Sequence, residues 1–127
     1  MTGSYSPFQP AARPGSKPPS KPAYRVLVHR RFVGLWEQLP DRVGLESAQQ
    51  FYDHVADTPG ATPAVNSSTI LKGKAGKPKF EGGSRTVHYE ISGAGRIDYQ
   101  FVNDYTDGAH GDPHPVVFIL SIDLSSH

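Results

Sequence analysis

The sequence predicts an α+β domain, with two N-terminal helices packed on one face of a small, mainly antiparallel sheet. Apolar residues recur with helical spacing in the first half of the chain and alternate with polar residues in the second half. Helical patterns that precede strand patterns, rather than alternating with them, are typical of the α+β class. The expected element order is therefore strand, helix, helix and then three or four strands.

Two apolar stripes predict the helices. The first stripe comprises Phe32, Leu35, Trp36 and Leu39, and the second comprises Leu45, Ala48, Phe51, Tyr52 and Val55. We expect Pro40 to end the first helix, because proline disfavours helical geometry in the residue before it. Asp41 is an expected cap of the second helix, which Pro59-Gly60 stops. We expect the first stripe to pack in the core. The alternative is that it is exposed and binds a helix of a partner protein.

The strands are predicted from alternation. Tyr24, Val26 and Val28 indicate a first strand, residues 69–71 a short one, and the nearly apolar run 116–122 a central one. A hairpin joins residues 87–91 to residues 97–101. Pairing Ile91 with Ile97 and Tyr89 with Tyr99 places the apolar residues of this hairpin on one face. The other, partly open face then carries His88, Glu90, Asp98 and Gln100.

The N-terminal segment has the composition of an unfolded tail. Residues 1–23 hold six of the twelve prolines, three cations and no acidic residue, so they cannot bury enough apolar surface to order themselves. We expect a disordered, proline-rich basic tail over 1–23 and one domain over 24–127. No run of about 20 apolar residues is present, and there is no cysteine. A cytoplasmic protein without a membrane segment or cofactor is expected.

Positive charge is concentrated between the helices and the hairpin. Three of the thirteen Lys and Arg residues lie in the tail, which leaves ten cations against twelve acidic residues in the domain. Five of these ten fall within fourteen residues, against the single acid Glu81: Lys72, Lys74, Lys77, Lys79 and Arg85. A local cation cluster suits a phosphate-bearing partner. The alternative is a solvated lysine loop without a ligand.

The domain resembles the RelE/ParE superfamily of bacterial toxins. The resemblance lies in a helix that ends in Leu39-Pro40, in the turn Leu71-Lys72-Gly73-Lys74, and in the strand Val87-His88-Tyr89-Glu90-Ile91. It implies the toxin of a toxin–antitoxin pair, with a cognate antitoxin as partner. The RelE-like branch, which we favour, cleaves mRNA on the ribosome. The ParE-like branch inhibits DNA gyrase without nuclease activity, so a non-catalytic binding module is the alternative.

The resemblance also implies site residues. Lys72 and Lys74 match the lysine turn, Arg85 approximates a strand arginine that holds the scissile phosphate, and His127 stands where a terminal proton-transfer residue is found. His88 is a second candidate base, because the pKa of imidazole lies near operating pH. Lys77, Lys79 and Gln100 are expected to bind substrate. An ordinary strand histidine at 88 and a frayed terminus at 127 are the alternatives.

One departure concerns Arg85. The family arginine lies three residues before the strand tyrosine, whereas Arg85 lies four before Tyr89. In a regular strand this spacing places Arg85 on the packed face, so a bulge at Gly83-Ser84 is needed to turn it outward.

A second constellation competes with the RNA-cleaving site. His110, Asp112 and His114 form a compact His-x-Asp-x-His pattern, and imidazole with carboxylate is a set of groups that divalent metals accept. Glu90 and Asp98, expected to face each other across the hairpin, would need a cation or proton between them. A metal-dependent hydrolase is therefore the third hypothesis.

Overall fold

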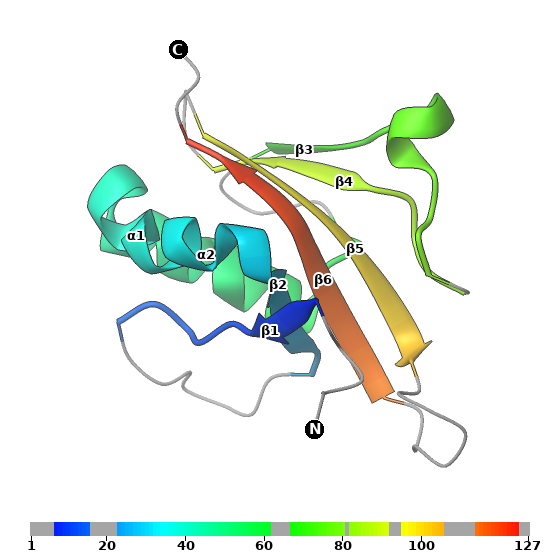
Figure 1. Cartoon of the computed structure of the whole chain (residues 1–127), viewed down its shortest axis with the longest axis horizontal. Helices are drawn as coiled ribbons and strands as arrows, with labels where there is room; N and C mark the ends of the chain where they lie inside the picture. Colours follow the sequence, from blue (N-terminus) through cyan, green and yellow to red (C-terminus); the bar gives the residue numbers. More distant parts are fainter. Residues whose placement is uncertain are drawn as a thin grey trace.

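The computed structural model of the chain describes residues 7–15, 23–61, 67–80, 82–91, 95–105 and 114–124. The elements in chain order are β1 (Phe8–Pro10), β2 (Arg25–His29), the 3-10 turn η1 (Arg30–Phe32), α1 (Val33–Val43), α2 (Leu45–Asp57), β3 (Ser67–Ile70), the 3-10 turn η2 (Gly73–Gly76), β4 (Val87–Glu90), β5 (Arg96–Tyr105) and β6 (His114–Asp123). Two helices thus accompany a six-stranded sheet in this part of the chain, and the α+β class is confirmed (Figure 1).

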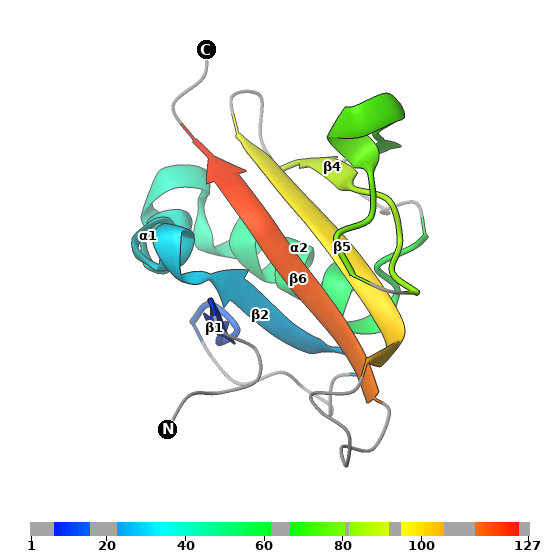
Figure 2. The ribbon, with the colours of Figure 1, turned by 45° about the vertical axis from the view of Figure 1, so that its right-hand side comes forward.

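The predicted element order is wrong at its start. An unexpected strand, β1, precedes the strand that the alternation at Tyr24–Val28 indicates, whereas four strands follow the helices, within the expected three or four. The strands lie in the order β1-β2-β6-β5-β4-β3. The β2–β6 pair is parallel and the other pairs are antiparallel, so the sheet is mixed. The parallel pair joins β2, from the first half of the chain, to β6, the last strand (Figure 2).

The helices share a core with one set of sheet side chains. Figure 1 shows α1 and α2 together on one side of the sheet. Trp36 and Leu39 of α1 and Phe51 of α2 are buried with Tyr89 and Tyr99, and the Phe51 ring centroid lies 4.8 Å from that of Tyr89. Among the described residues, neither helix has the length and apolar character needed to cross a bilayer.

The predicted boundary between the helices is wrong. Pro40 lies inside α1, which continues to Val43, and Asp41 is therefore a residue of α1 rather than the cap of α2. Gly44, with φ of 96°, separates the helices, because glycine enters this left-handed region without steric cost. Leu39, the residue before Pro40, is nevertheless helical, and its side chain is buried in the core.

The expected disordered tail is wrong for residues 7–15. Strand β1 pairs with the outer edge of β2, and the chain then crosses the helices. There the Trp36 indole N–H donates to the Ala12 carbonyl at 3.0 Å, and the Gln49 amide donates to the Pro14 carbonyl at 2.9 Å. Arg13 forms two hydrogen bonds to the Asp53 carboxylate at 2.8 and 3.0 Å. Residues 1–6 and 16–22 lie outside the described residues.

A second apolar cluster covers the sheet face that turns away from the helices. Its buried members are Leu27, Val102, Val116 and Phe118, and its half-buried members are Phe8, Phe80, Tyr105 and Leu120. Leu27 lies between Val26 and Val28, which belong to the helical core, so alternation along β2 places the two clusters on opposite faces. The face that the sequence predicts to be partly open is therefore covered over part of its area.

The hairpin register differs from the predicted one by two residues. Tyr89 lies opposite Ile97 and Val87 lies opposite Tyr99. A shift of two keeps every side chain on its face, and Tyr89 and Tyr99 are accordingly both buried. The shift changes which polar residues are neighbours on the other face.

Candidate functional site

The basic loop, residues 71–86 between β3 and β4, is fixed by its own backbone. The Leu71 N–H donates to the Thr86 carbonyl at 2.9 Å, and the Thr86 N–H donates to the Gly76 carbonyl at 3.0 Å. A Cβ atom at Gly76 would lie 1.9 Å from the Leu71 oxygen, so only glycine allows this close approach. Glu81 lies outside the described residues. Turn η2 projects from the side of the sheet opposite the helices (Figures 1 and 2).

Arg85 holds the turn together. Its Nε donates to the Leu71 carbonyl at 2.9 Å, and its Nη2 donates to the Gly73 carbonyl at 2.7 Å. The sequence predicts a phosphate-binding catalytic role for this residue. In the structure two of the guanidinium nitrogens already bond to backbone oxygens, so the observed contacts of Arg85 are those of a residue that shapes the loop.

The chain does carry an extra residue beside Arg85. The Ser84 N–H donates to the Phe101 carbonyl and the Ser84 hydroxyl accepts from the Phe101 N–H, so these two residues are paired. Val87 is paired with Tyr99, and three steps along one strand therefore match two along the other. The extra residue thus lies between Ser84 and Val87 rather than at Gly83-Ser84, where the arginine spacing predicts the bulge, and Thr86 and Val87 are buried in succession.

Gln100 fastens the second half of the basic loop to the sheet. Its side chain is 0% exposed. Its Oε1 accepts from the Lys79 N–H at 2.9 Å, and its Nε2 donates to the Lys77 carbonyl at 3.0 Å and to the Thr86 hydroxyl at 2.9 Å. The prediction that Gln100 binds substrate is therefore wrong for this structure, because the loop that it anchors covers it.

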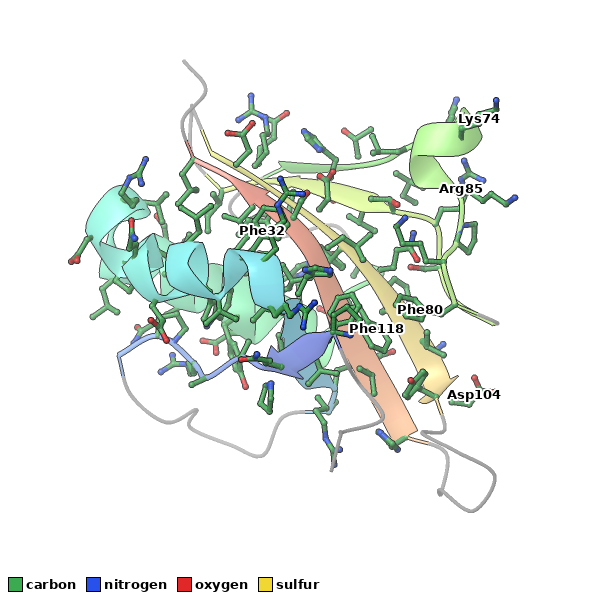
Figure 3. The ribbon with its side chains drawn as sticks, in the orientation of Figure 1. Phe32, Lys74, Phe80, Arg85, Asp104 and Phe118 are labelled. Atoms are coloured by element: carbon green, nitrogen blue, oxygen red, sulfur yellow. The ribbon has the colours of Figure 1, made fainter. Side chains whose placement is uncertain are left out.

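The four lysines of the loop lie on its outer surface. Lys72, Lys74, Lys77 and Lys79 are all exposed, and none forms an ion pair with a described residue. Figure 3 shows Lys74 at the outer end of the turn, beside Arg85. The loop therefore presents four ammonium groups on a rigid support, as an anionic ligand requires.

His88 and Asp98 form a directly paired dyad on the same face of the sheet. The two residues are register partners in β4 and β5, and His88 Nδ1 lies 2.5 Å from Asp98 Oδ1. Both side chains are partly exposed, at 31% and 26%. Nε2 of His88 has no hydrogen-bond partner among the described residues and is not among their buried, unpaired polar atoms, so it reaches solvent. Asp98 thereby orients an imidazole whose second nitrogen is accessible.

Further polar residues flank the dyad. By register, Thr69 lies opposite His88 and Ser121 lies opposite Asp98. In the next row Glu90 lies opposite Arg96, and the predicted opposition of Glu90 and Asp98 is therefore wrong. Each carboxylate instead faces a basic side chain, which relieves the repulsion that a like-charged pair would create.

The dyad and the lysine turn lie on one face but do not touch. Lys72 follows Thr69 by three residues, which corresponds to roughly 10 Å of extended chain. The lysines are thus near enough to hold neighbouring phosphates of a polymer whose reacting group lies at His88.

Comparisons with family models, with curated proteins and with solved structures found no match to this chain.

Several residues predicted from the sequence fall outside this arrangement. His127, His110 and Asp112 lie outside the described residues. His114 begins β6, and its ring centroid lies 6.1 Å from that of Tyr105. Within the described ranges, no group of three or more His, Asp or Glu side chains is placed to hold a metal ion.

A pocket of about 510 Å³ opens at the other end of the sheet. It lies between the N-terminal segment, the start of β2, α2 and the start of β6, and its lining includes Tyr24, Arg25, Tyr52 and His114. Neither His88 nor a lysine of the basic loop contributes to it. The pocket is therefore separate from the dyad.

Asp98 is the site residue that sequence reasoning missed as a partner of His88. Alternation correctly placed both residues on one face, but the predicted turn of three residues paired Asp98 with Glu90. Pairing Glu90 with Arg96 instead gives the observed register and places unlike charges opposite each other. Charge complementarity across the hairpin was the available signal.

Proposed function

We propose that the chain is a RelE-like toxin that cleaves mRNA, with His88 as general base and Asp98 as its positioning residue. The observation that carries the proposal is the 2.5 Å His88–Asp98 pair, whose free imidazole nitrogen shares a sheet face with four exposed lysines. A ribosome-bound mRNA substrate, a cognate antitoxin and a cytoplasmic location belong to the same proposal, and they rest on the family resemblance.

The chemistry follows from the free nitrogen of the dyad. Asp98 favours the tautomer in which Nδ1 carries the proton, so Nε2 of His88 accepts the proton of a ribose 2′-hydroxyl. The 2′-oxygen attacks the adjacent phosphorus, the P–O5′ bond breaks, and the products are a 2′,3′-cyclic phosphate and, after protonation, a 5′-hydroxyl. A second proton-transfer group completes the reaction, and the resemblance assigns that role to His127.

The lysines position the RNA. Lys72 lies roughly 10 Å along the chain from Thr69, the register partner of His88, and Lys74 lies farther along, so we expect both to bind phosphates on neighbouring nucleotides. Because the domain as a whole has a small net negative charge, this binding is local to the loop. Positioning of the substrate beside His88 is the contribution that the loop makes to the rate.

The test is mRNA cleavage in a reconstituted translation reaction, mapped by primer extension. We expect His88→Asn to reduce cleavage by about 10²–10⁴-fold, the usual contribution of a general base. His114→Asn is the matched control and keeps full activity. Equal cleavage by the wild type and His88→Asn would remove His88 from the mechanism. Loss of cleavage in His114→Asn alone would favour the metal-dependent hydrolase.

A non-catalytic binding module, ParE-like or domesticated, is the second candidate. The contacts of Arg85 and Gln100 favour it, because two residues expected to act on substrate are committed to holding the basic loop. Growth arrest on expression, with cellular mRNA left intact, would support this function in place of cleavage.

A further inference from the structure

Phe80 lies flat on the sheet with one ring face turned outward. Its ring is stacked on Phe118, with centroids 4.0 Å apart and planes inclined by 17°. Phe118 is 1% exposed and lies in the second apolar cluster, whereas Phe80 is only half-buried. Phe118 therefore covers the inner face of the Phe80 ring (Figure 3).

The neighbouring rings flank this stack without covering it. The Phe8 centroid lies 5.0 Å from Phe118 and 6.0 Å from Phe80. The Tyr105 centroid lies 5.2 Å from Phe118 and 6.4 Å from Phe80. A ring above the outer face of Phe80 would be nearer to Phe80 than to Phe118, and both flanking rings show the reverse. Among the described rings, none lies over the outer face of Phe80.

The same segment carries positive charge and is rigidly held. Lys79 directly precedes Phe80, and Lys77 lies two residues earlier; both side chains are exposed. Gln100 bonds to the backbone of both lysines, at 2.9 and 3.0 Å. A flat aromatic ring beside two exposed lysines with a fixed backbone is complementary to a nucleobase and to the phosphates on either side of it.

We propose that Phe80 is a stacking platform for one base of single-stranded RNA, with Lys77 and Lys79 binding the flanking phosphates. The inference rests on the proposed function in taking RNA as the ligand, but it does not require cleavage. Single strands are the substrate class because the bases of a duplex are stacked on one another and cannot splay onto a side chain. The platform lies on the same side of the sheet as the dyad.

The experiment uses the full chain and a 2′-O-methyl RNA octamer with one 2-aminopurine, which binds but has no 2′-hydroxyl to attack. We expect Phe80→Leu to weaken binding by about 5- to 150-fold with an unchanged salt dependence, since stacking contributes about 1–3 kcal/mol per base. Lys77→Ala and Lys79→Ala should each lower the slope of log K against log salt by about 0.7. Phe80→Trp should retain binding.

Phe32→Leu is the matched control. Phe32 is also half-buried and has a cation beside it, with Arg31 Cζ 5.8 Å from its ring centroid, but it packs against the helical core. The Phe32→Leu variant should therefore bind the RNA octamer with wild-type affinity. Wild-type affinity in a folded Phe80→Leu protein would overturn the platform, as would bound RNA whose 2-aminopurine fluorescence is not quenched. Displacement of the RNA by a duplex or by an acidic peptide at equal concentration would also overturn it.

The two proposals fail separately. If His88→Asn cleaves mRNA as well as the wild type does, the binding of the uncleavable octamer still tests Phe80. If Phe80→Leu binds normally while His88→Asn abolishes cleavage, the platform is wrong and the ribonuclease stands.

Discussion

His54 is a histidine of α2 whose imidazole has one nitrogen shut off from water. Its Nε2 is buried and has no hydrogen-bond partner among the described residues, and its ring centroid lies 5.8 Å from that of Tyr89. Burial lowers the pKa of His54 and outweighs two effects that raise it, a hydrogen bond with the Ala61 backbone and the charge of Asp57. The imidazole is therefore neutral in the folded protein at pH 7.

This environment predicts that acid destabilises the fold through His54. The unfolded imidazole titrates near pH 6.5 and the folded one at a lower pH, so below about 6.5 the unfolded state binds the proton first. The contribution of neutral His54 to the free energy of unfolding is fully present above about pH 6.5. It is lost as the pH decreases toward the folded pKa. Denaturant unfolding between pH 8 and 5 should show the wild type losing stability relative to His54→Leu, by at most about 1.4 kcal/mol per pH unit. Parallel plots of unfolding free energy against pH for the two proteins would contradict this role of His54.

Single residues of the site show what a sequence pattern can predict. Residue type and parity placed His88 and Asp98 on one face, and the spacing of Arg85 indicated an irregularity near it, which the structure places between Ser84 and Val87. The roles of Arg85 and Gln100 were not predictable in this way. Their partners are backbone groups of residues 71–79 and the Thr86 hydroxyl, and only the folded path of the loop brings those atoms within reach.

Among the elements, the basic loop combines an exposed charged surface with a tightly fixed backbone. Four lysines face solvent, while Arg85, Gln100 and Gly76 hold the chain from within. A mobile lysine loop would lose conformational entropy each time it bound an anion. A fixed loop avoids this cost, because it is ordered before the ligand arrives.

Gly76→Ala tests whether the backbone fixes the loop. Its Cβ would meet the Leu71 oxygen, so we expect the change to cost about 1–3 kcal/mol and to weaken RNA binding by moving Lys72 and Lys74. Gly34→Ala is the control, since Gly34 lies in α1 with nothing within 4 Å of the added atom. It should stabilise the protein by about 0.5–1 kcal/mol. Equal thermal shifts for the two variants would contradict the assigned role of Gly76.

The N-terminal segment is the element that the sequence most clearly failed to predict. Its proline content and lack of an apolar stripe indicate disorder when the segment is read alone. Its order comes from distant side chains, namely Trp36, Gln49 and Asp53, which bind residues 12–14 from the helices. Local patterns cannot report bonds made by residues more than twenty positions away. The two amphipathic helices and the alternating strands were predictable because their signals are local.

At the scale of the molecule, the sheet is packed on both faces. The helical core lies on one face, and the smaller cluster beneath the basic loop lies on the other. Strand β6 contributes to both, since Ile119 is buried among the helices and Phe118 is buried beneath Phe80. The nearly apolar run 116–122 predicted a strand covered on both sides, and its burial confirms this. The cover of the second face was not predictable in the same way, because Phe80 reaches it only through the folded path of the basic loop.

The two faces of β6 should respond differently to the same kind of truncation. Ile119→Ala should cost about 2–5 kcal/mol and Phe118→Ala about 3–5 kcal/mol, because each leaves a cavity. In native-state hydrogen exchange, Ile119→Ala should speed exchange throughout the sheet through global unfolding. Phe118→Ala should in addition free the loop amides of residues 77–86 by local opening, since Phe80 loses the ring on which it is stacked. RNA affinity should therefore fall more in Phe118→Ala than in Ile119→Ala, when both are measured at a temperature at which both remain folded. Identical exchange patterns in the two variants would show that the second cluster does not hold the basic loop.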